Sequence, residues 1–277
     1  MAKLVMPQGK TALVTGSTDG VGRRVAERLG AMGARVLLHG RDRFRGEQIA
    51  AAIRAAGNPD VEFLAADLSS VSEVRRLAGA VRDAHPRLDI LINNAGVGSG
   101  GSRGVRQISG DGFELRFAVN YLAGFLLTTL LLPLLRASAP ARIVNVASAG
   151  QSPIDFDDVM LERNYSGGRA YTQSKLAQIM FTFDLARELA GSGVTVNALH
   201  PATYMDTTMV RQSGVAPMST VDEGADAILN LAVAPALADV SGQYFNRLQR
   251  ARADAQAYDE RARSTLRELS QRLTGLA

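Results

Sequence analysis

The chain contains no cysteine among its 277 residues. This absence excludes disulfide bonds, thiolate metal sites and a cysteine nucleophile. The chain also has only three histidines, His39, His85 and His200, which lie far apart in the sequence. A zinc site would need carboxylates to complete its ligand set, so we predict that the protein has no metal site.

Long apolar runs and blocks of one charge are also missing. The longest apolar run, residues 125–135, has 11 residues and includes two threonines and Pro133. It is too short to span a bilayer, and residues 1–8 lack the apolar core of a signal peptide. The net charge of +4 comes from arginines interspersed with acidic residues. We therefore expect a cytoplasmic protein with no membrane span and no nucleic-acid partner.

The order of the predicted elements indicates an α/β fold in one domain, residues 1–277. Hydrophobic residues make up 46% of the chain and charged residues 21%, as in ordinary globular proteins. Strands are predicted at residues 11–15, 34–39, 61–66, 88–92, 141–147, 193–199 and 242–245. Helices are predicted at residues 21–32, 44–56, 71–84, 113–135, 171–189 and 221–233, with a further docked helix at 250–275. This alternation predicts a doubly wound parallel sheet of about seven strands with helices on both faces.

A glycine-rich turn, Gly16-Ser-Thr-Asp-Gly20-Val-Gly22, separates the first predicted strand from the first helix. Such a turn brings backbone N–H groups and a helix N-terminus against a pyrophosphate, where Cβ atoms would obstruct the contact. The spacing Gly-x-x-x-Gly-x-Gly departs from the usual dinucleotide fingerprint Gly-x-Gly-x-x-Gly. A dinucleotide site is therefore one interpretation, and a glycine turn without a function is the other.

The end of the second predicted strand favours NADP(H) over NAD(H). An acidic residue in this place would bind the ribose 2′-hydroxyl of NAD, but the sequence reads Gly40-Arg41. A small residue followed by arginine makes room for a 2′-phosphate and pairs with it. The alternative is a surface arginine that opens the next helix. Asp67 and residues 93–96 follow later strands and are expected at the same edge of the sheet.

Tyr171 and Lys175 are four residues apart in the predicted helix 171–189 and therefore share one face. A phenol with a pKa of about 10 is a poor acid or base at neutral pH. A lysine ammonium beside it would lower that pKa and suit the phenol to exchange a proton with a carbonyl or alcohol oxygen. Taken alone, the pair favours a solvated helix face over a catalytic role, so its meaning depends on the other motifs.

Together these motifs resemble the short-chain dehydrogenases/reductases in order and approximate spacing, over residues 8–246. The resemblance rests on Thr15-Gly16-x-x-x-Gly20-x-Gly22, Asn93-Asn-Ala-Gly96, Asn120, Ser148 and Tyr171-x-x-x-Lys175. It implies a Rossmann-type domain in which Ser148 orients the substrate oxygen for Tyr171. It also implies that Lys175 holds the nicotinamide ribose and that Asn120 holds a water linking the lysine to solvent. The expected cofactor-binding residues are Gly16, Thr18, Gly20, Val21, Gly22, Arg41, Asp67, Leu68, Asn94, Ala95, Gly96, Tyr171, Lys175 and Pro201.

Two segments around the predicted helix 171–189 depart from the shorter members of that family. The insert 151–170 is similar to that of the branch containing retinol dehydrogenases and light-dependent protochlorophyllide reductases. Ala202 stands where the family has glycine, and the loop 203–220 that follows is rich in methionine and valine. Such an adaptable loop suits a lid over an apolar substrate, whereas ordinary packing is the alternative. The resemblance further implies a possible homodimer built from helices 113–135 and 171–189.

These patterns predict an NADP(H)-dependent enzyme that interconverts a ketone or aldehyde and an alcohol, with a hydrophobic or polycyclic carbonyl as its substrate. The nicotinamide cofactor would carry the hydride, and the protein would orient the substrate and move the proton. Two other hypotheses stay open at this point. One is a dinucleotide-binding regulator without turnover, because a fold does not guarantee a function. The other is a dehydratase or epimerase that acts through a transient ketone.

Overall fold

The computed structural model describes residues 9–100 and 105–276, whose strands form a single sheet. The order across this sheet of eight strands is β3-β2-β1-β4-β5-β6-β7-β8. The strands are β1 (Thr11–Val14), β2 (Arg35–Gly40), β3 (Val61–Ala65), β4 (Ile90–Asn93), β5 (Ala141–Val146), β6 (Val194–His200), β7 (Tyr244–Asn246) and β8 (Gln249–Arg250). All pairs from β3 to β7 are parallel, which confirms the predicted sheet, and β8 is antiparallel to β7. The short β8 was not predicted.

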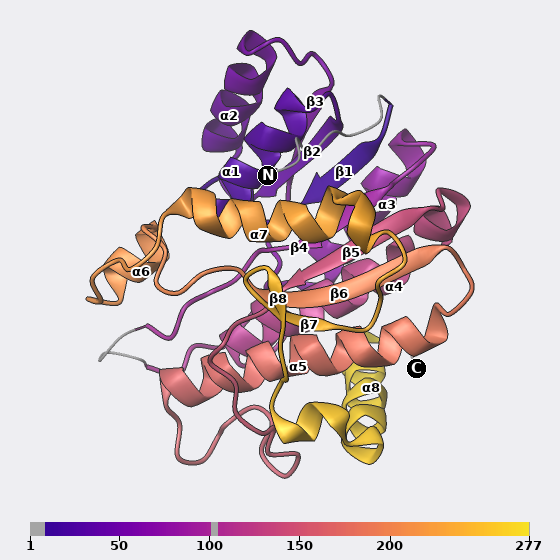
Figure 1. Cartoon of the computed structure of the whole chain (residues 1–277). Coiled ribbons are helices and arrows are strands. Elements are labelled where there is room, and N and C mark those ends of the chain that lie inside the picture. The colour runs from indigo at the N-terminus through magenta and orange to yellow at the C-terminus, as the bar shows by residue number, and fades with distance from the viewer. Residues whose placement is uncertain (1–8, 101–104, 277) are drawn as a thin grey trace.

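Helices cover both faces of the sheet, as expected for a doubly wound domain (Figure 1). One face carries α1 (Gly20–Ala31), α2 (Arg43–Ala55) and α7 (Val221–Val233). The other face carries α3 (Val71–Ala84), α4 (Ala123–Ala137) and α5 (Gly167–Glu188). Because side chains alternate along a strand, Ala12 and Val14 of β1 face the first layer and Leu13 faces the second.

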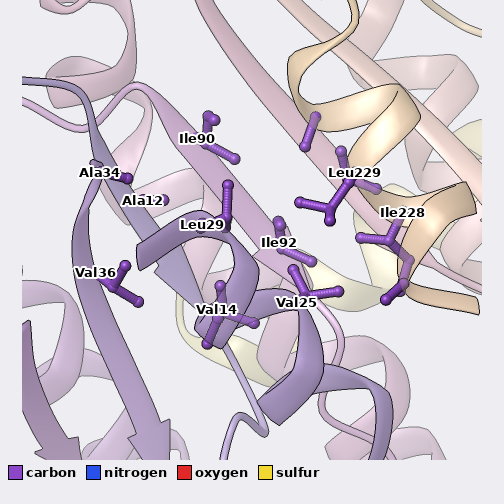
Figure 2. Packing of buried hydrophobic residues seen from close by; sticks show 14 of the residues in the cluster. Ala12, Val14, Val25, Leu29, Ala34, Val36, Ile90, Ile92, Ile228 and Leu229 are labelled. Atoms are coloured by element: carbon purple, nitrogen blue, oxygen red, sulfur yellow. The ribbon is translucent and has the colours of Figure 1, made fainter. Parts of the chain in front are cut away.

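Figure 2 shows the core on the first face, where labelled side chains of two helices meet those of three strands. Val25 and Leu29 of α1 and Ile228 and Leu229 of α7 are fully buried there. They pack against the side chains of β1, β2 and β4, namely Ala12, Val14, Val36, Ile90 and Ile92. The first face is therefore closed by α1 and α7, whose amino-terminal ends lie near the carboxyl edge of the sheet, where ligands bind in such folds.

Three helices begin elsewhere than the sequence predicts. The helix predicted at 113–135 begins later, with the π-helical segment η2 (Phe117–Leu122), and continues as α4. Helix α5 begins at Gly167 because Ser166 caps it, with its side chain accepting a hydrogen bond from the backbone N–H of Arg169. The last residues of the predicted insert 151–170 are therefore helical. The predicted helix 250–275 is shorter, since it starts only at Glu260, after the cap residue Asp259. It is preceded by β8 and a 3₁₀ turn, η4 (Ala255–Tyr258).

The C-terminal helix α8 (Glu260–Thr274) packs on the outer side of α4 and α5. Leu266 of α8 is buried in the same cluster as Phe125 of α4 and Met180 of α5. The hydroxyl groups of Tyr121 and Ser270 lie 2.7 Å apart and are hydrogen-bonded. This helix covers part of the surface on which a homodimer was expected. The homodimer stays a prediction.

One helix in the described part of the chain, residues 117–137, is long and apolar enough to cross a membrane by length and composition. It joins a π-helical segment, η2 (Phe117–Leu122), to α4 and so exceeds the apolar run seen in the sequence. Of its most apolar window, 67% is buried inside the fold, as in a core helix of a globular protein. The expected lack of a leader concerns residues 1–8, which lie outside the described residues. The absence of a membrane span and a cytoplasmic location stay predictions.

Candidate active site

The glycine turn between β1 and α1 lies in close contact with the loop that follows β4. Gly16 and Gly20 both have positive φ, +64° and +52°, a backbone conformation that favours glycine. A Cβ on Gly16 would lie 2.8 Å from the Cα of Ala95. Asp19 caps α1, with its carboxylate accepting a hydrogen bond of 2.7 Å from the N–H of Gly20. The predicted strand–turn–helix unit is therefore present, and its glycine turn lies at the carboxyl edge of the sheet.

Asn94, expected to bind the cofactor, has its side chain directed at the glycine turn. Its Nδ2 donates to the backbone oxygens of Thr15 at 2.9 Å and Gly16 at 3.2 Å. The hydroxyl of Thr15 accepts hydrogen bonds from the backbone N–H groups of Asn94 and Ala95. A Cβ on Gly22 would lie only 2.2 Å from the Asn94 amide, so no other residue fits at this position. Asn94 therefore acts on this site by holding the turn.

His39 was not predicted as a site residue. It is a buried residue one position before the end of β2, and its Nδ1 accepts a hydrogen bond of 3.1 Å from the N–H of Gly16. Its Nε2 lies 3.2 Å from the backbone oxygen of Ala66. Burial lowers the pKa of His39 to about 4, so the imidazole is neutral at physiological pH. A histidine inside an apolar strand, one residue before Gly40-Arg41, was the available sign.

Basic side chains follow β2 at the edge of the glycine turn. Arg41 is exposed, and in residues 9–100 and 105–276 it has no ion pair. Arg45 pairs instead with Asp19, at 3.2 Å. A Cβ on Gly40 would lie 2.4 Å from the methyl group of Thr18, so a small residue is needed at this position. The predicted combination of a small residue and a free arginine is therefore present at the end of β2.

Two predicted residues stand at the end of β3. Asp67 is half-buried, and its carboxylate accepts a hydrogen bond of 2.9 Å from the N–H of Ser69. Leu68 is buried. Val21 and Pro201, also predicted, are buried at the start of α1 and directly after β6. All four positions lie at the carboxyl ends of strands or in the segments that follow them.

Asn120 lies in the π-helical turn that begins the long helix. There the N–H of Ala123 bonds to the oxygen of Ala118, five residues back, which widens the helix by one residue. The Asn120 Oδ1 accepts from the N–H of Val97 at 2.7 Å, and its Nδ2 donates to the hydroxyl of Ser174 at 2.9 Å. This buried amide therefore joins the segment after Gly96 to helix α5.

Lys175 is buried beside Asn120 and Gly96. A Cβ on Gly96 would lie 3.3 Å from the Asn120 Oδ1 and 3.6 Å from the Lys175 Nζ. The Nζ donates to the backbone oxygen of Val146 and to the Oε1 of Gln178, both at 2.9 Å. Burial lowers the pKa of Lys175 to about 7, so the amine is close to its titration midpoint at neutral pH.

Tyr171 and Ser148 complete the predicted set. The Lys175 Nζ lies 5.7 Å from the centroid of the Tyr171 ring. The pKa of Tyr171 is raised, first because burial disfavours the phenolate, and a hydrogen bond with Ser148 opposes the rise. The expectation that Lys175 would lower this pKa is not met in the structure, because burial raises the pKa and Lys175 is not among the groups that lower it. Tyr244, which was not predicted, donates to the backbone oxygen of Ser148 at 2.9 Å.

A buried polar chain continues from Lys175 into the core below the site. Gln178, the acceptor of the lysine, offers its backbone oxygen to the hydroxyl of Thr182 at 2.8 Å. Thr182 in turn accepts from the Nδ2 of Asn145, and Asn145 accepts from the Nδ2 of Asn93. The first residue of the Asn93–Gly96 motif is therefore connected to Lys175 through this chain of buried hydrogen bonds.

The loop 203–220 lies over the glycine turn. It contains a short helix, α6 (Thr208–Gln212), and a methyl group of Thr207 lies 3.1 Å from where a Gly20 Cβ would be. Met209 comes equally close to Gly98, in the segment after β4. Tyr204 has a φ of +44° and is near enough to Tyr171 to add to the rise in its pKa. The loop therefore spans the space between the glycine turn and the Tyr171 phenol.

A buried pair of charged residues, Arg116 and Glu114, connects the insert to the segment after β4. Arg116 and Glu114 are both almost fully buried and lie 3.3 Å apart. The Nη1 of Arg116 donates to the Tyr165 hydroxyl of the insert at 2.7 Å, and its Nε donates to the oxygen of Gly98 at 2.9 Å. Glu114 also accepts from the N–H of Phe117, where the π-helical segment starts. The insert, the segment after β4 and the helix of Asn120 are thus held together.

The structure brings the four predicted catalytic residues, Asn120, Ser148, Tyr171 and Lys175, to one place beside the glycine turn. In the described ranges, no group of three or more His, Asp or Glu residues is placed to hold a metal ion. The arrangement offers one phenol, one hydroxyl and one amine around a point where a substrate oxygen could sit. It can exchange a proton with such an oxygen.

Comparisons with known proteins agree with this geometry. The family model of the short chain dehydrogenases matches residues 10–216. Human retinol dehydrogenase 13 is 41% identical over 294 residues, covering 99% of this chain and 87% of the relative.

Solved structures are similar over most of the chain. The crystal structure of an uncharacterised protein from Mycobacterium paratuberculosis has a TM-score of 0.82 and 31% identity, covering 99% of this chain and 96% of that one. The NADP complex of Pseudomonas aeruginosa RhlG has a TM-score of 0.73 and 31% identity, covering 89% of this chain and 97% of that one. The chain therefore belongs to the short-chain dehydrogenases, in the branch similar to retinol dehydrogenases, and is an oxidoreductase that acts on CH–OH groups.

Proposed function

We propose that the protein is an NADP(H)-dependent oxidoreductase that reduces a hydrophobic or polycyclic ketone or aldehyde to its alcohol. The observation that carries this proposal is the convergence of Tyr171, Ser148, Lys175 and Asn120 beside the glycine turn. Tyr171 and Lys175 share helix α5, Ser148 follows β5 and Asn120 lies in η2, so the meeting of the four side chains depends on the whole fold. A proton-transfer site beside a dinucleotide site is what carbonyl reduction requires.

The residues at the carboxyl edge of the sheet fit a dinucleotide with a 2′-phosphate. The glycine turn leaves no room for Cβ atoms at Gly16 and Gly22, so its backbone is held in one conformation. Arg41 supplies an exposed guanidinium directly after the small residue Gly40. A guanidinium binds a phosphate through charge-assisted hydrogen bonds, which NAD cannot offer at its 2′-hydroxyl. The Pseudomonas aeruginosa relative that was solved as an NADP complex supports the same preference.

Bound NADPH would supply the hydride. Tyr171 is protonated at neutral pH because its pKa is raised, so its hydroxyl donates the proton to the carbonyl oxygen. Ser148 hydrogen-bonds the same oxygen and fixes its place. The amine of Lys175, with a pKa of about 7, gains or loses charge as the phenol changes its own, which limits the cost of forming the phenolate. Asn120 holds the water that returns the proton from solvent.

The loop 203–220 gives the substrate preference in this proposal. Tyr204, Met209 and Met218 are exposed, at 47%, 41% and 71% of their surface. Exposed apolar side chains around a binding cleft favour an apolar ligand, and the unbranched methionines adapt to its shape. Large carbonyl compounds with an apolar body fit this rim better than small aliphatic ones.

The test is an NADPH-consumption screen over polycyclic aromatic ketones, steroids, retinal and small aliphatic carbonyls, with NADH as the paired cofactor. We expect turnover with at least one large apolar carbonyl and a preference for NADPH. Binding of NADPH without turnover on any of these substrates would instead support a non-catalytic regulator. Mass analysis of the product separates reduction from dehydration or epimerisation, because only reduction adds two hydrogens.

A further inference from the structure

His39 connects two separate segments at the carboxyl edge of the sheet, the glycine turn after β1 and the segment after β3. Its Nδ1 accepts from the N–H of Gly16 in the glycine turn, and its Nε2 faces the oxygen of Ala66 before Asp67 and Leu68. The imidazole is 2% exposed; its contact with Ala66 is buried and its contact with Gly16 is partly buried. In this tautomer Nδ1 carries the lone pair and Nε2 carries the hydrogen.

One neutral imidazole makes both contacts through its two nitrogens. The hydrogen bond from Gly16 is partly buried, and its loss would leave the Gly16 N–H without the side chain that holds the turn. Gly16 also lies so close to Ala95 that a Cβ on Gly16 would be 2.8 Å from the Ala95 Cα. The imidazole and the loop after β4 together therefore restrict the conformation of the turn. The low pKa of His39 agrees with this role, because a protonated Nδ1 would point a second hydrogen at the Gly16 N–H.

We infer that His39 is a positioning residue that sets the dinucleotide affinity by fixing the glycine turn relative to the Ala66–Leu68 segment. This inference rests on the proposed function, since it concerns the same cofactor site. His39 need not touch the cofactor, because it acts through the backbone of Gly16 and Ala66. The turn faces the pyrophosphate and the segment after β3 faces the adenosine end, and both parts are shared by NADPH and NADH.

The side chain can be changed without removing the strand pairing around it. Ser17 bonds only to the backbone of His39, with its N–H donating to the oxygen of His39 and its Oγ accepting from the N–H of His39. In His39→Asn the Oδ1 stands in the place of Nδ1 and can still accept from Gly16. In His39→Gln the Nε2 stands in the place of the imidazole Nε2 and can still donate to Ala66. His39→Leu keeps neither bond.

The experiment measures the Kd of NADPH and of NADH by fluorescence titration for the wild type and these three variants. We expect His39→Leu to raise both Kd values by about tenfold and by the same factor, since a turn that His39 no longer fixes must be ordered when either dinucleotide binds. His39→Asn should recover most of the affinity and His39→Gln less. The kcat at saturating NADPH should stay within about twofold of the wild type. His85→Leu, which removes a buried imidazole at the end of α3, should leave both Kd values unchanged.

Each outcome decides the inference. A lower Tm in His39→Leu with both Kd values within twofold of the wild type would reduce His39 to a structural residue. Equal affinities in folded His39→Asn and His39→Gln would overturn the assignment to the Gly16 bond. Failure of the wild type to bind either dinucleotide would overturn the proposed function and this inference together. Wild-type binding that His39→Leu retains would overturn the inference alone.

Discussion

The two sides of the active site are held in different ways. On the cofactor side, the Asn94 side chain donates to the backbone oxygens of Thr15 and Gly16, and the N–H of Gly16 donates to His39. The hydroxyl of Thr15 accepts from the backbone of Asn94 and Ala95 and so ties the turn to the loop after β4. On the substrate side, the loop 203–220 is held by the backbone bridge between Met205 and Ser219 and by the packing of Met205 against the core of the first face, while most of its other side chains are exposed. Its ion pair, Asp206 with Arg211, is exposed and contributes little to stability.

This difference fits a cofactor site that must keep one shape and a substrate loop whose shape can vary. A dinucleotide has one shape, and a turn with few degrees of freedom binds it at a low entropic cost. A loop with few buried contacts opens at a low free-energy cost and can repack around ligands of different shapes. Substitutions on the cofactor side should therefore change affinity by large factors for every substrate. Substitutions on the substrate side should have smaller effects that depend on the carbonyl compound.

The largest effect is expected at Tyr171, which serves both sides. Tyr171→Phe keeps the ring in place and removes only the hydroxyl that donates the proton. We expect kcat/KM for the best carbonyl substrate to fall by a factor of about 10²–10⁴, the usual contribution of general acid catalysis. The Kd of NADPH should stay within about twofold. Retention of most of the turnover would refute the proton-donor role.

Lys175→Met should lower kcat by a factor of about 10²–10³, as the loss of one electrostatic contact to the reacting group does elsewhere. It should also change the pH dependence of stability. The pKa of Lys175 is about 7 in the folded chain and 10.5 for the free side chain, so the unfolded chain binds more protons between these values. The free energy of unfolding of the wild type should rise with pH across that window, by at most about 1.4 kcal/mol per pH unit.

In Lys175→Met this contribution to the slope should vanish. Urea unfolding at pH 7 and at pH 9.5 measures it directly for both proteins. Identical slopes in the two proteins would show that the amine is not desolvated by the fold.

Arg41→Ala should raise the Kd of NADPH by a factor of about 10–100, because one to two charge-assisted hydrogen bonds to the 2′-phosphate are lost. The Kd of NADH should hardly change, since NADH has no such phosphate. Arg35→Ala is the matched control, because Arg35 stands at the opposite end of the same strand. An unchanged ratio of the two Kd values would assign Arg41 to the protein surface.

The smallest effect is expected on the substrate side, at Met209, which contacts the segment after β4 at Gly98. Met209→Ala should raise KM about three- to tenfold for a large apolar carbonyl, in line with the loss of one to two buried methylene groups. KM for a small aliphatic carbonyl should stay the same. A uniform change over all substrates would point to a role in folding of the loop.

Much of the cofactor side could be predicted from the sequence because it depends on local rules. Glycines with a fixed spacing, strands that end in polar residues and a Tyr–Lys pair at helical spacing are all visible in short windows. Gly16, Gly20 and Gly22 are found in the turn, and Asn120, Ser148, Tyr171 and Lys175 meet as expected. The alternation of strands and helices also predicted the parallel sheet.

The contacts that the sequence did not predict are formed by residues distant in the chain. His39 meets Gly16 and Ala66 across neighbouring strands, and Tyr244 reaches Ser148 from the last parallel strand. The raised pKa of Tyr171 depends on how many groups surround it, which spacing cannot indicate. The hydrogen bonds from Asn94 to the glycine turn could not be predicted either, because a motif identifies a residue without giving the direction of its side chain.

The position of α8 has a consequence for how the protein is made. Helix α8 follows every strand of the sheet in the sequence, yet Leu266 and Ser270 complete the packing around Tyr121 and α5. During synthesis the sheet and the catalytic helix can assemble before α8 has been translated. The outer sides of α4 and α5 then remain uncovered and apolar, the condition in which growing chains aggregate or engage chaperones. Helix α8 thus covers this apolar surface only after all strands of the sheet have been made.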